Sequence, residues 1–456
     1  MHAHAFLQAL TVVLCVAALT AILFQRLRQP VVLGYLLAGL VVGPHVPIPL
    51  VADMDIVQTL SELGVILLMF SLGLEFSFTK LARVGASAGL TAVIESSIVL
   101  WLGFITGRLL GWTTLESLFA GSAIAISSTT IIAKTFDEQK VGGALRALVV
   151  GVLLVEDLIA ILLMATLTPI AGGAGLSAGV LAATAGRLFV FLFALIGIGL
   201  FVVPRATRAV TRLGSNETTL VAAVGFCFAT AWLANHFGYS VALGAFIAGS
   251  LIGESGEERR VEHLVHPLRD MFAAIFFVSV GMLLDPRLVA EHWQAVAIFT
   301  VIVIVGKIIG VTLGAFLAGN GVRTSIRAGM AMAQIGEFSF IIAALGLTLK
   351  ATRPFLYPIA VAVSAITTLT TPFLIRLSDR AASAVDRRLP RHLQTYAALY
   401  GSWWERTHRG EDARPTRRLF LLLAVDMALL CILIIGTSVY LIDLGTLIER
   451  RVGTSV

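Results

Sequence analysis

The chain has 456 residues, of which 58% are hydrophobic and only 13% are charged, and its mean hydropathy is +0.94. Soluble domains carry about 25% charged residues, so this composition excludes a soluble domain, a disordered chain and a disulfide-stapled secreted module. The 33 Lys and Arg against 27 Asp and Glu give a net charge of +6, which in a membrane protein belongs to cytoplasmic loops and does not indicate a nucleic-acid partner.

Apolar runs near the length that crosses a lipid bilayer, about 20 residues, recur along the whole chain. The first run lacks a preceding basic region and a small-residue cleavage site, which favours a membrane helix over a removable signal peptide. Two short runs contain several Gly residues, so we expect them to pack tightly against their neighbours. The predicted spans are roughly 5–24, 30–44, 58–74, 87–110, 115–134, 144–168, 181–202, 216–236, 240–252, 265–284, 294–318, 324–349 and 355–378.

Lys and Arg side chains gather in alternate loops. One set of loops carries most of them, around 26–28, 80–83, 134–146, 205–212, 259–269 and 323–327. The other set holds only Arg108, Arg287, Lys350 and Arg353. By the positive-inside rule the first set is cytoplasmic, which predicts a multi-pass protein of the inner (plasma) membrane with its N-terminus outside.

Six spans precede the middle helix at 181–202 and six follow it, so the second six enter the membrane from the opposite side. Inverted repeats of this kind are typical of secondary transporters, whose substrate site lies near the midplane where the repeats meet. The predicted fold is an all-α polytopic membrane protein with about thirteen transmembrane helices in two six-helix units. The membrane domain covers 1–378, with repeat one at about 5–168, the linker helix at 181–202 and repeat two at about 216–378.

The remainder of the chain differs in composition. Residues 379–417 are polar and basic, which predicts a cytoplasmic linker, and 418–456 contain a further apolar run that is long enough to span. Spanning would leave Arg450 and Arg451 outside, against the charge rule. Either this extra helix lies differently or the chain is a fragment of a longer protein.

Five ionisable groups fall inside the apolar runs: Glu95, Glu156, Asp157, Lys307 and Glu337. Each costs about 2.5–3.5 kcal/mol at a helix centre, so a functional role is the default expectation. Asp157 and Lys307 lie near the midpoints of their helices, so at equal depth in the membrane they can form an ion pair. The pair either takes part in transport or only holds the two helices together. A cation or proton that binds Asp157 weakens its hold on Lys307, and such competition for one carboxylate is the minimal chemistry of an antiporter.

Glu156 and Asp157 are adjacent and therefore point about 100° apart on a helix, so they cannot both face one site. Asp157 is the predicted ligand of a monovalent metal cation. Glu156 is a second coordinating group, a proton carrier or the satisfied partner of a neighbouring helix, and Glu95 is a candidate accessory group.

The fifth span of each repeat has a polar centre. The first contains Ser127, Ser128, Thr129 and Thr130, and the second contains Gln334, Gly336 and Glu337. Polar residues at equivalent places in two repeats predict discontinuous helices, whose freed carbonyls and half-helix dipoles bind or steer a cation. The alternative for the Ser/Thr run is hydrogen bonding between packed helices.

Seven sequence motifs occur in order along the membrane domain: V-L-G-Y-L-L-A-G-L-V-V-G-P (32–44), F-S-L-G-L-E-F (70–76), A-I-S-S-T-T (125–130), V-E-D-L (155–158), A-L-G-A-F-I-A-G (242–249), F-F-V-S-V-G-M (276–282) and A-Q-I-G-E-F-S-F (333–340). With them the chain resembles the monovalent cation:proton antiporter-2 family, which includes bacterial Na⁺/H⁺ antiporters and potassium efflux antiporters. The resemblance implies that Asp157 binds the ion and the proton and that Lys307 matches the family's lysine of the eleventh helix. It also implies that 127–130 and 334–337 lie at the two unwound crossings.

The resemblance further implies a homodimer that works by an elevator-like movement, in which helices four to six and eleven to thirteen form the mobile core. Two features depart from the family pattern. Glu156 stands where the family commonly has Asn, Asp or Gln, so rules for electrogenicity and for Na⁺ versus K⁺ do not transfer. Potassium-efflux members also carry a cytoplasmic nucleotide-binding domain, and no stretch after 378 resembles one.

The sequence therefore predicts a secondary active transporter that exchanges Na⁺ or K⁺ for H⁺ by alternating access, without a cofactor. An enzyme is not expected, since a zinc-protease H-E-x-x-H motif is missing. The alternative is a ligand-gated K⁺ efflux protein that requires a soluble regulatory domain or subunit.

Overall fold

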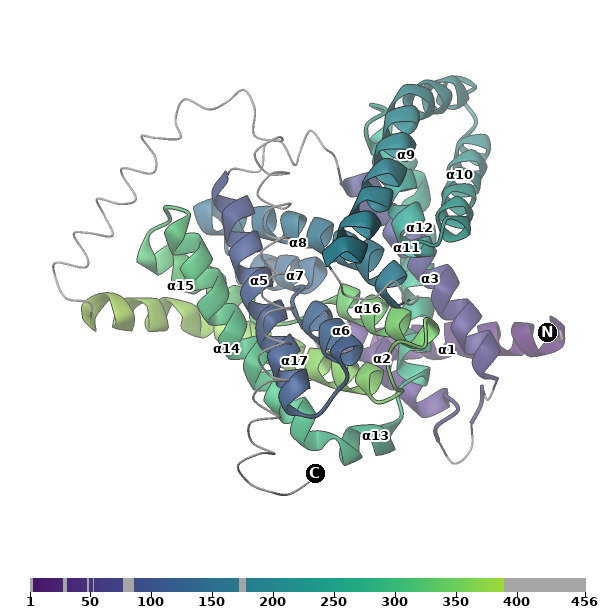
Figure 1. Cartoon of the computed structure of the whole chain (residues 1–456). Helices are drawn as coiled ribbons and strands as arrows, with labels where there is room; N and C mark the ends of the chain where they lie inside the picture. Colours follow the sequence, from purple (N-terminus) through teal and green to yellow (C-terminus); the bar gives the residue numbers. More distant parts are fainter. Residues whose placement is uncertain are drawn as a thin grey trace, which may run out of the picture. The chain divides into compact units, whose positions relative to one another are not determined.

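The computed structural model describes residues 3–27, 31–46, 49–51, 53–76, 86–171 and 178–388 (Figure 1). Within these ranges the protein is built from α-helices joined by turns, and no β-strand occurs there. The predicted all-α class is confirmed. The part of the predicted linker beyond 388 and the additional helix at 418–456 lie outside the described residues.

Nine of the described helices are long and apolar enough to cross a membrane, and three shorter apolar helices accompany them. The chain is therefore an integral membrane protein. The nine are α1 (Ala3–Arg26), α3 (Met54–Glu75), α5 (Ala86–Leu109), α8 (Gly143–Pro169), α9 (Ala178–Arg212), α10 (Asn216–His236), α12 (Glu258–Met282), α14 (Trp293–Leu317) and α17 (Leu356–Arg388). The shorter ones are α2 (Val31–Val42), α11 (Val241–Gly253) and α16 (Glu337–Thr348).

Two of the predicted spans are each divided into two helices. The span at 115–134 consists of α6 (Thr114–Ile124) and α7 (Thr129–Glu138), and the span at 324–349 consists of α15 (Val322–Ala331) and α16. A short helix, α13 (Pro286–Glu291), precedes α14. The count of thirteen crossings stays a prediction, because length and composition identify nine full spans among the described helices.

The same order of helices occurs before and after α9. A long helix is followed by a short one, two long ones, a divided one and a final long one: α1, α2, α3, α5, α6/α7 and α8, then α10, α11, α12, α14, α15/α16 and α17. This order agrees with the predicted repeats on the two sides of the linker helix.

The described residues pack as two compact units. Unit 1 comprises Met1–Leu81, Ile161–Trp293 and Tyr357–Val361, and unit 2 comprises Ala82–Ala160, Gln294–Leu356 and the chain from Ala362. Helices α8 and α17 therefore each contribute residues to both units.

In unit 1 the short helices α2 and α11 pack backbone to backbone against longer ones. A Cβ atom added to Gly249 of α11 would lie 2.1 Å from the carbonyl oxygen of Phe70 in α3. One added to Gly39 of α2 would lie 1.9 Å from that of Val278 in α12. Any side chain at these positions would force the helices apart. The predicted tight packing of the two short, Gly-bearing spans is confirmed.

In unit 2 helix α5 packs closely against both α6 and α14. A Cβ atom on Gly103 of α5 would lie 2.7 Å from Gly121 Cα in α6. On α14, a Cβ atom on Gly310 would lie 3.3 Å from Glu95 Cα, and one on Gly314 would lie 2.9 Å from the carbonyl oxygen of Thr91. These contacts bring Glu95, in the middle of α5, next to Lys307 of α14.

Helix α17 continues to Arg388, past the predicted end of the membrane domain at 378. Asp379 lies in this extension, and its Oδ1 atom is 3.1 Å from Arg323 Nη2 and 3.4 Å from Arg327 Nε of α15. Several Ala residues in the extension favour helix, and the exposed ion pairs add at most about 1 kcal/mol each. The first residues of the predicted linker are therefore helical.

Candidate functional site

Two crossing segments of unit 2 are interrupted in the middle, which confirms the predicted discontinuous helices. The first is non-helical between Ile124 and Thr129, and the second between Ala331 and Glu337. Ser128 caps α7, because its side chain accepts a hydrogen bond from the backbone N–H of Ile131 at 3.3 Å.

The two interruptions are bonded to each other. The Gly336 N–H donates to the Ile126 carbonyl at 3.0 Å, and Gln334 Nε2 donates to the Ser128 carbonyl at 3.2 Å. Ser128 Oγ donates to Glu337 Oε2 at 2.8 Å, in the first turn of α16. Backbone groups freed by the interruptions thus find partners inside the protein, as the membrane interior requires.

Replacing Gly336 by Ala is expected to disturb this junction. The added Cβ would lie 2.7 Å from both the backbone N and the Cα of Ser128, so the backbone of one segment must shift. Overpacking of this kind costs about 1–3 kcal/mol. We expect a lower melting temperature in detergent and a reduced exchange rate in liposomes. Gly321→Ala, at a position with nothing within 4 Å of the added Cβ, is the matched control, and equal behaviour of the two variants would contradict the prediction.

A fully buried ammonium group lies beside the first interruption. Lys307 Nζ donates to Glu95 Oε1 at 2.7 Å, to the Ala125 carbonyl at 2.8 Å and to Ser127 Oγ at 2.9 Å. An ammonium has three hydrogens, so these three bonds use all of them. Ala125 follows the last turn of α6, where the helix dipole is negative, and Lys307 therefore stabilises this helix end.

Glu156 is also fully buried and supports the same interruption. Its Oε2 atom accepts a hydrogen bond from the Ser127 N–H at 2.7 Å. Its Oε1 atom has no hydrogen-bond partner among the described residues and lies 3.9 Å from Lys307 Nζ. Through Oε2, Glu156 is a partner of the neighbouring segment; which of its three predicted roles it has stays a prediction.

Asp157 points in another direction and is partly exposed, in contrast to the fully buried Glu95 and Glu156. Thr129 Oγ1, at the start of α7, lies 3.4 Å from Asp157 Oδ2 and donates a hydrogen bond to it. The side chain of Thr130 lies outside the described residues. A carboxylate and a hydroxyl thus converge where the first crossing segment is interrupted.

The carboxylate that hydrogen bonds to Lys307 is therefore Glu95, which the sequence suggested only as an accessory group, whereas pairing with Asp157 was the sequence expectation. The cause is the close approach of α5 to α14. Gly306, Gly310 and Gly314 recur every four residues around Lys307, and in the structure they face α5. This small-residue stripe was a usable sequence signal that α14 packs tightly beside Lys307.

Unit 2 contains all the predicted site residues. Hydrogen bonds join Lys307 to Glu95 and Ser127, and Ser127 to Glu156, whereas Asp157 bonds to Thr129. Residues that the sequence analysis did not single out act through the backbone or a hydroxyl. They include Ala125, whose carbonyl accepts from Lys307, and Ser339, whose Oγ donates to the Ala123 carbonyl. Carbonyl roles carry no side-chain signal, so the sequence could not indicate Ala125.

Comparison with known proteins shows which family this chain resembles. Residues 12–376 match the family model described as "Sodium/hydrogen exchanger, transmembrane". The chain is 33% identical over 381 residues to K⁺ efflux antiporter 5 of Arabidopsis thaliana, covering 82% of this chain and 66% of that protein. It is 34% identical over 361 residues to the putative cation/proton antiporter YbaL of Escherichia coli (strain K12), covering 76% of this chain and 64% of that protein. The chain thus spans about two thirds of the length of these relatives.

A solved structure shares the fold. The sodium proton antiporter MjNhaP1 of Methanocaldococcus jannaschii, determined at pH 8, aligns with a TM-score of 0.68 and 16% sequence identity. The alignment covers 84% of this chain and 99% of that structure. The shared helical architecture and the family match over most of the chain lead to one conclusion: the protein belongs to the transmembrane sodium/hydrogen exchanger family.

Proposed function

We propose that the protein exchanges a monovalent cation for H⁺ across the membrane, and that Asp157 binds the two competitively. The observation that carries this proposal is the partly exposed carboxylate of Asp157 beside Thr129, where the first crossing helix is interrupted. A hard cation prefers oxygen ligands, and a carboxylate and a hydroxyl group both occur here. The family assignment and the names of the relatives support the same activity.

In the proposed cycle, Asp157 loses its proton and binds a dehydrated cation with help from oxygen atoms near 127–130. The cation leaves on the other side of the membrane, and a proton then takes its place on Asp157. Since one carboxylate cannot hold both at once, the two movements are coupled.

Lys307, Glu95 and Glu156 have a supporting role in this proposal. All three are fully buried, and they hold the ends of the interruption through Ala125 and Ser127. We infer that Lys307 holds the end of α6 in place, because its three hydrogen bonds are all directed at this cluster. The second interruption, with Gln334, Gly336 and Glu337, positions Ser128 at the start of α7.

We further propose an elevator-type movement. The residues named for ion binding all belong to unit 2, so they can move as one body. Unit 2 consists largely of α5–α8 and α14–α17, and these helices correspond to the mobile core that the family resemblance implies. The homodimer, the inner-membrane location and the cytoplasmic placement of the Lys/Arg-rich loops are parts of the same proposal.

Proton movement in liposomes tests this function. The purified chain is reconstituted into vesicles that contain a pH-sensitive dye, and K⁺, Na⁺, Li⁺ or choline is added outside. K⁺ is tested first, because one of the relatives is named a K⁺ efflux antiporter. We expect the internal pH to rise with K⁺ or Na⁺ and to stay unchanged with choline and in protein-free vesicles. The same response to choline as to the metal cations would refute cation exchange.

A ligand-gated K⁺ efflux protein is the second candidate. It is supported by the relatives' greater length, because this chain covers only about two thirds of them. The same vesicles distinguish it: exchange that starts only after a nucleotide or a soluble protein fraction is added would favour gating over autonomous exchange.

A further inference from the structure

A long apolar groove follows one face of α9 in unit 1. A cavity of about 980 Å³ is lined by α9 residues that recur every three to four positions between Gly186 and Val203, and by Phe226 and Leu233 of α10 and Leu251 of α11. Ligand sites typically occupy about 300–1,000 Å³, so this cavity has the size of a large ligand site.

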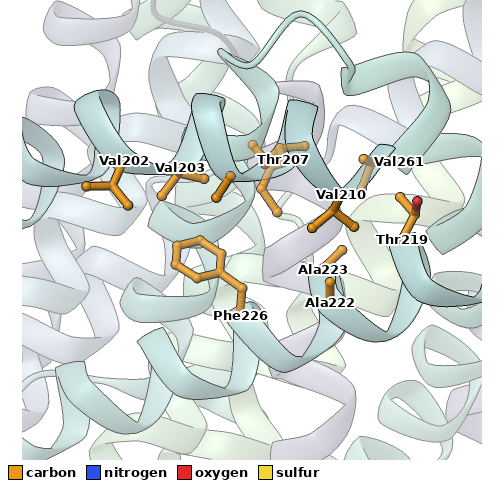
Figure 2. A pocket seen from close by; sticks show the side chains of 11 residues that line it. Val202, Val203, Thr207, Val210, Thr219, Ala222, Ala223, Phe226 and Val261 are labelled. Atoms are coloured by element: carbon orange, nitrogen blue, oxygen red, sulfur yellow. The ribbon is translucent and has the colours of Figure 1, made fainter. Parts of the chain in front are cut away.

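A smaller cavity of about 160 Å³ continues the groove along the same helix. It shares Val202, Val203 and Phe226 with the larger cavity and ends near Val210 and Thr219. Figure 2 shows the valine side chains of α9 and the Phe226 ring of α10 pointing toward each other across this space. The two cavities therefore adjoin each other along α9.

The larger cavity ends at a positive charge. Arg187 is the one charged side chain among the described residues that line it, and it is exposed. Tyr239 and Phe237 lie at the same end of the cavity, where both rings contact Phe191, one turn along α9 from Arg187, with ring centroids 4.6 and 5.6 Å apart. Arginine flanked by aromatic rings is typical of the membrane interface, where lipid phosphates lie.

The spacing along α9 fits this placement. From Arg187 to Arg205 the helix rises about 27 Å, close to the roughly 30 Å of a bilayer's hydrocarbon core. The α9 side chains between them include Val190 and Ile198, each 66% exposed, so the groove is open to the surrounding lipid. Any exposed apolar groove in a membrane contacts lipid tails; the single guanidinium at its end is what adds selectivity for a headgroup.

We propose that this groove is a binding site for an anionic phospholipid. Its phosphate group bonds to Arg187, and its acyl chains lie along α9 against Leu251 and Phe226. With the Lys/Arg-rich loops in the cytoplasm, as proposed above, the lipid belongs to the outer leaflet. The site does not depend on exchange activity, since it uses only residues of unit 1.

Native mass spectrometry of the purified full-length chain tests the site. Phosphatidylglycerol and phosphatidylcholine with identical acyl chains are added in detergent, and the lipid that remains bound is counted. We expect the wild type to retain phosphatidylglycerol preferentially. Arg187→Gln should reduce this retention about tenfold, because a charge-assisted bond to phosphate is lost. Arg205→Gln, at the other end of the same apolar segment, should leave it unchanged.

A second pair of variants tests the acyl chains. Ala194→Trp fills the groove and should reduce retention of both lipids, whereas Gly197→Trp projects from the same helix into open space and should not. If the Arg187 and Arg205 variants lost equal amounts of bound phosphatidylglycerol, the lipid would be held only by attraction to surface charge, and the proposed site would be refuted. If Ala194→Trp retained lipid as the wild type does but changed from a dimer to a monomer, the groove would instead be the contact surface for a second copy of the chain. If Ala194→Trp does not fold, the Arg187 comparison alone decides.

Discussion

Asp157→Asn is expected to reduce cation-driven proton movement in liposomes to the level of protein-free vesicles. The amide retains the size and the hydrogen-bonding capacity of the carboxyl group, so Thr129 keeps an acceptor. It has no charge to attract a cation and cannot exchange a proton. Loss of charge-assisted contacts alone, about 1.5–3 kcal/mol, would lower cation affinity at least about tenfold.

Glu156→Gln is the matched comparison, because it makes the same chemical change one residue away. A Gln at 156 still offers a carbonyl oxygen to the Ser127 N–H, so the interruption should remain intact. We therefore expect measurable exchange in Glu156→Gln and none in Asp157→Asn, in protein of equal melting temperature. If exchange survived in the Asp157 variant and disappeared in the Glu156 variant, Glu156 and not Asp157 would be the carboxylate that binds the ion.

Lys307→Met is expected to destabilise the protein more than any other single change in the cluster. It removes the only ammonium that faces Glu95 and Glu156 within the described cluster and leaves both carboxyl groups buried without their cationic neighbour. Breaking a buried ion pair from one side costs about 3–5 kcal/mol. The measurement is the melting temperature of purified protein in detergent, followed by tryptophan fluorescence.

The double variant Glu95→Gln/Lys307→Gln tests whether the loss of stability in Lys307→Met comes from leaving a buried carboxylate without its cation. It replaces the pair by two amides that can hydrogen bond, and we expect it to recover part of the stability that Lys307→Met loses. Lys350→Met, the same substitution at an exposed position, is the control and should change little. The structural role of Lys307 would be refuted if Lys307→Met melted at the temperature of the control.

Much of the fold could be predicted from hydropathy alone. Apolar runs marked all the long helices that the structure describes, because a bilayer requires long apolar helices with internally bonded backbones, whereas the short helix α13 lies between two of the predicted spans. The polar centres at 127–130 and 334–337 correctly indicated the two interruptions. Their surroundings are apolar, so clustered hydroxyl, amide and carboxyl groups stood out.

The partners of the charged groups could not be predicted in the same way. The sequence places Asp157 and Lys307 near the midpoints of their spans, which suggested that they pair. Lys307 instead bonds to Glu95, since Gly310 lets α14 approach the backbone of α5 at that residue. Asp379 in the extension of α17 likewise meets two arginines that lie far away in the sequence.

The sequence by itself determined that this is a helical membrane protein with two interrupted crossings and two adjacent acidic residues inside an apolar run, because hydropathy and polarity are local properties of the chain. Only the tertiary structure decided that, of the adjacent residues Glu156 and Asp157, the first is fully buried and the second is partly exposed. That difference arises from packing: Glu156 is covered by the Ser127 segment and bonds to its backbone, whereas Asp157, turned about 100° around the same helix, is left partly exposed beside Thr129.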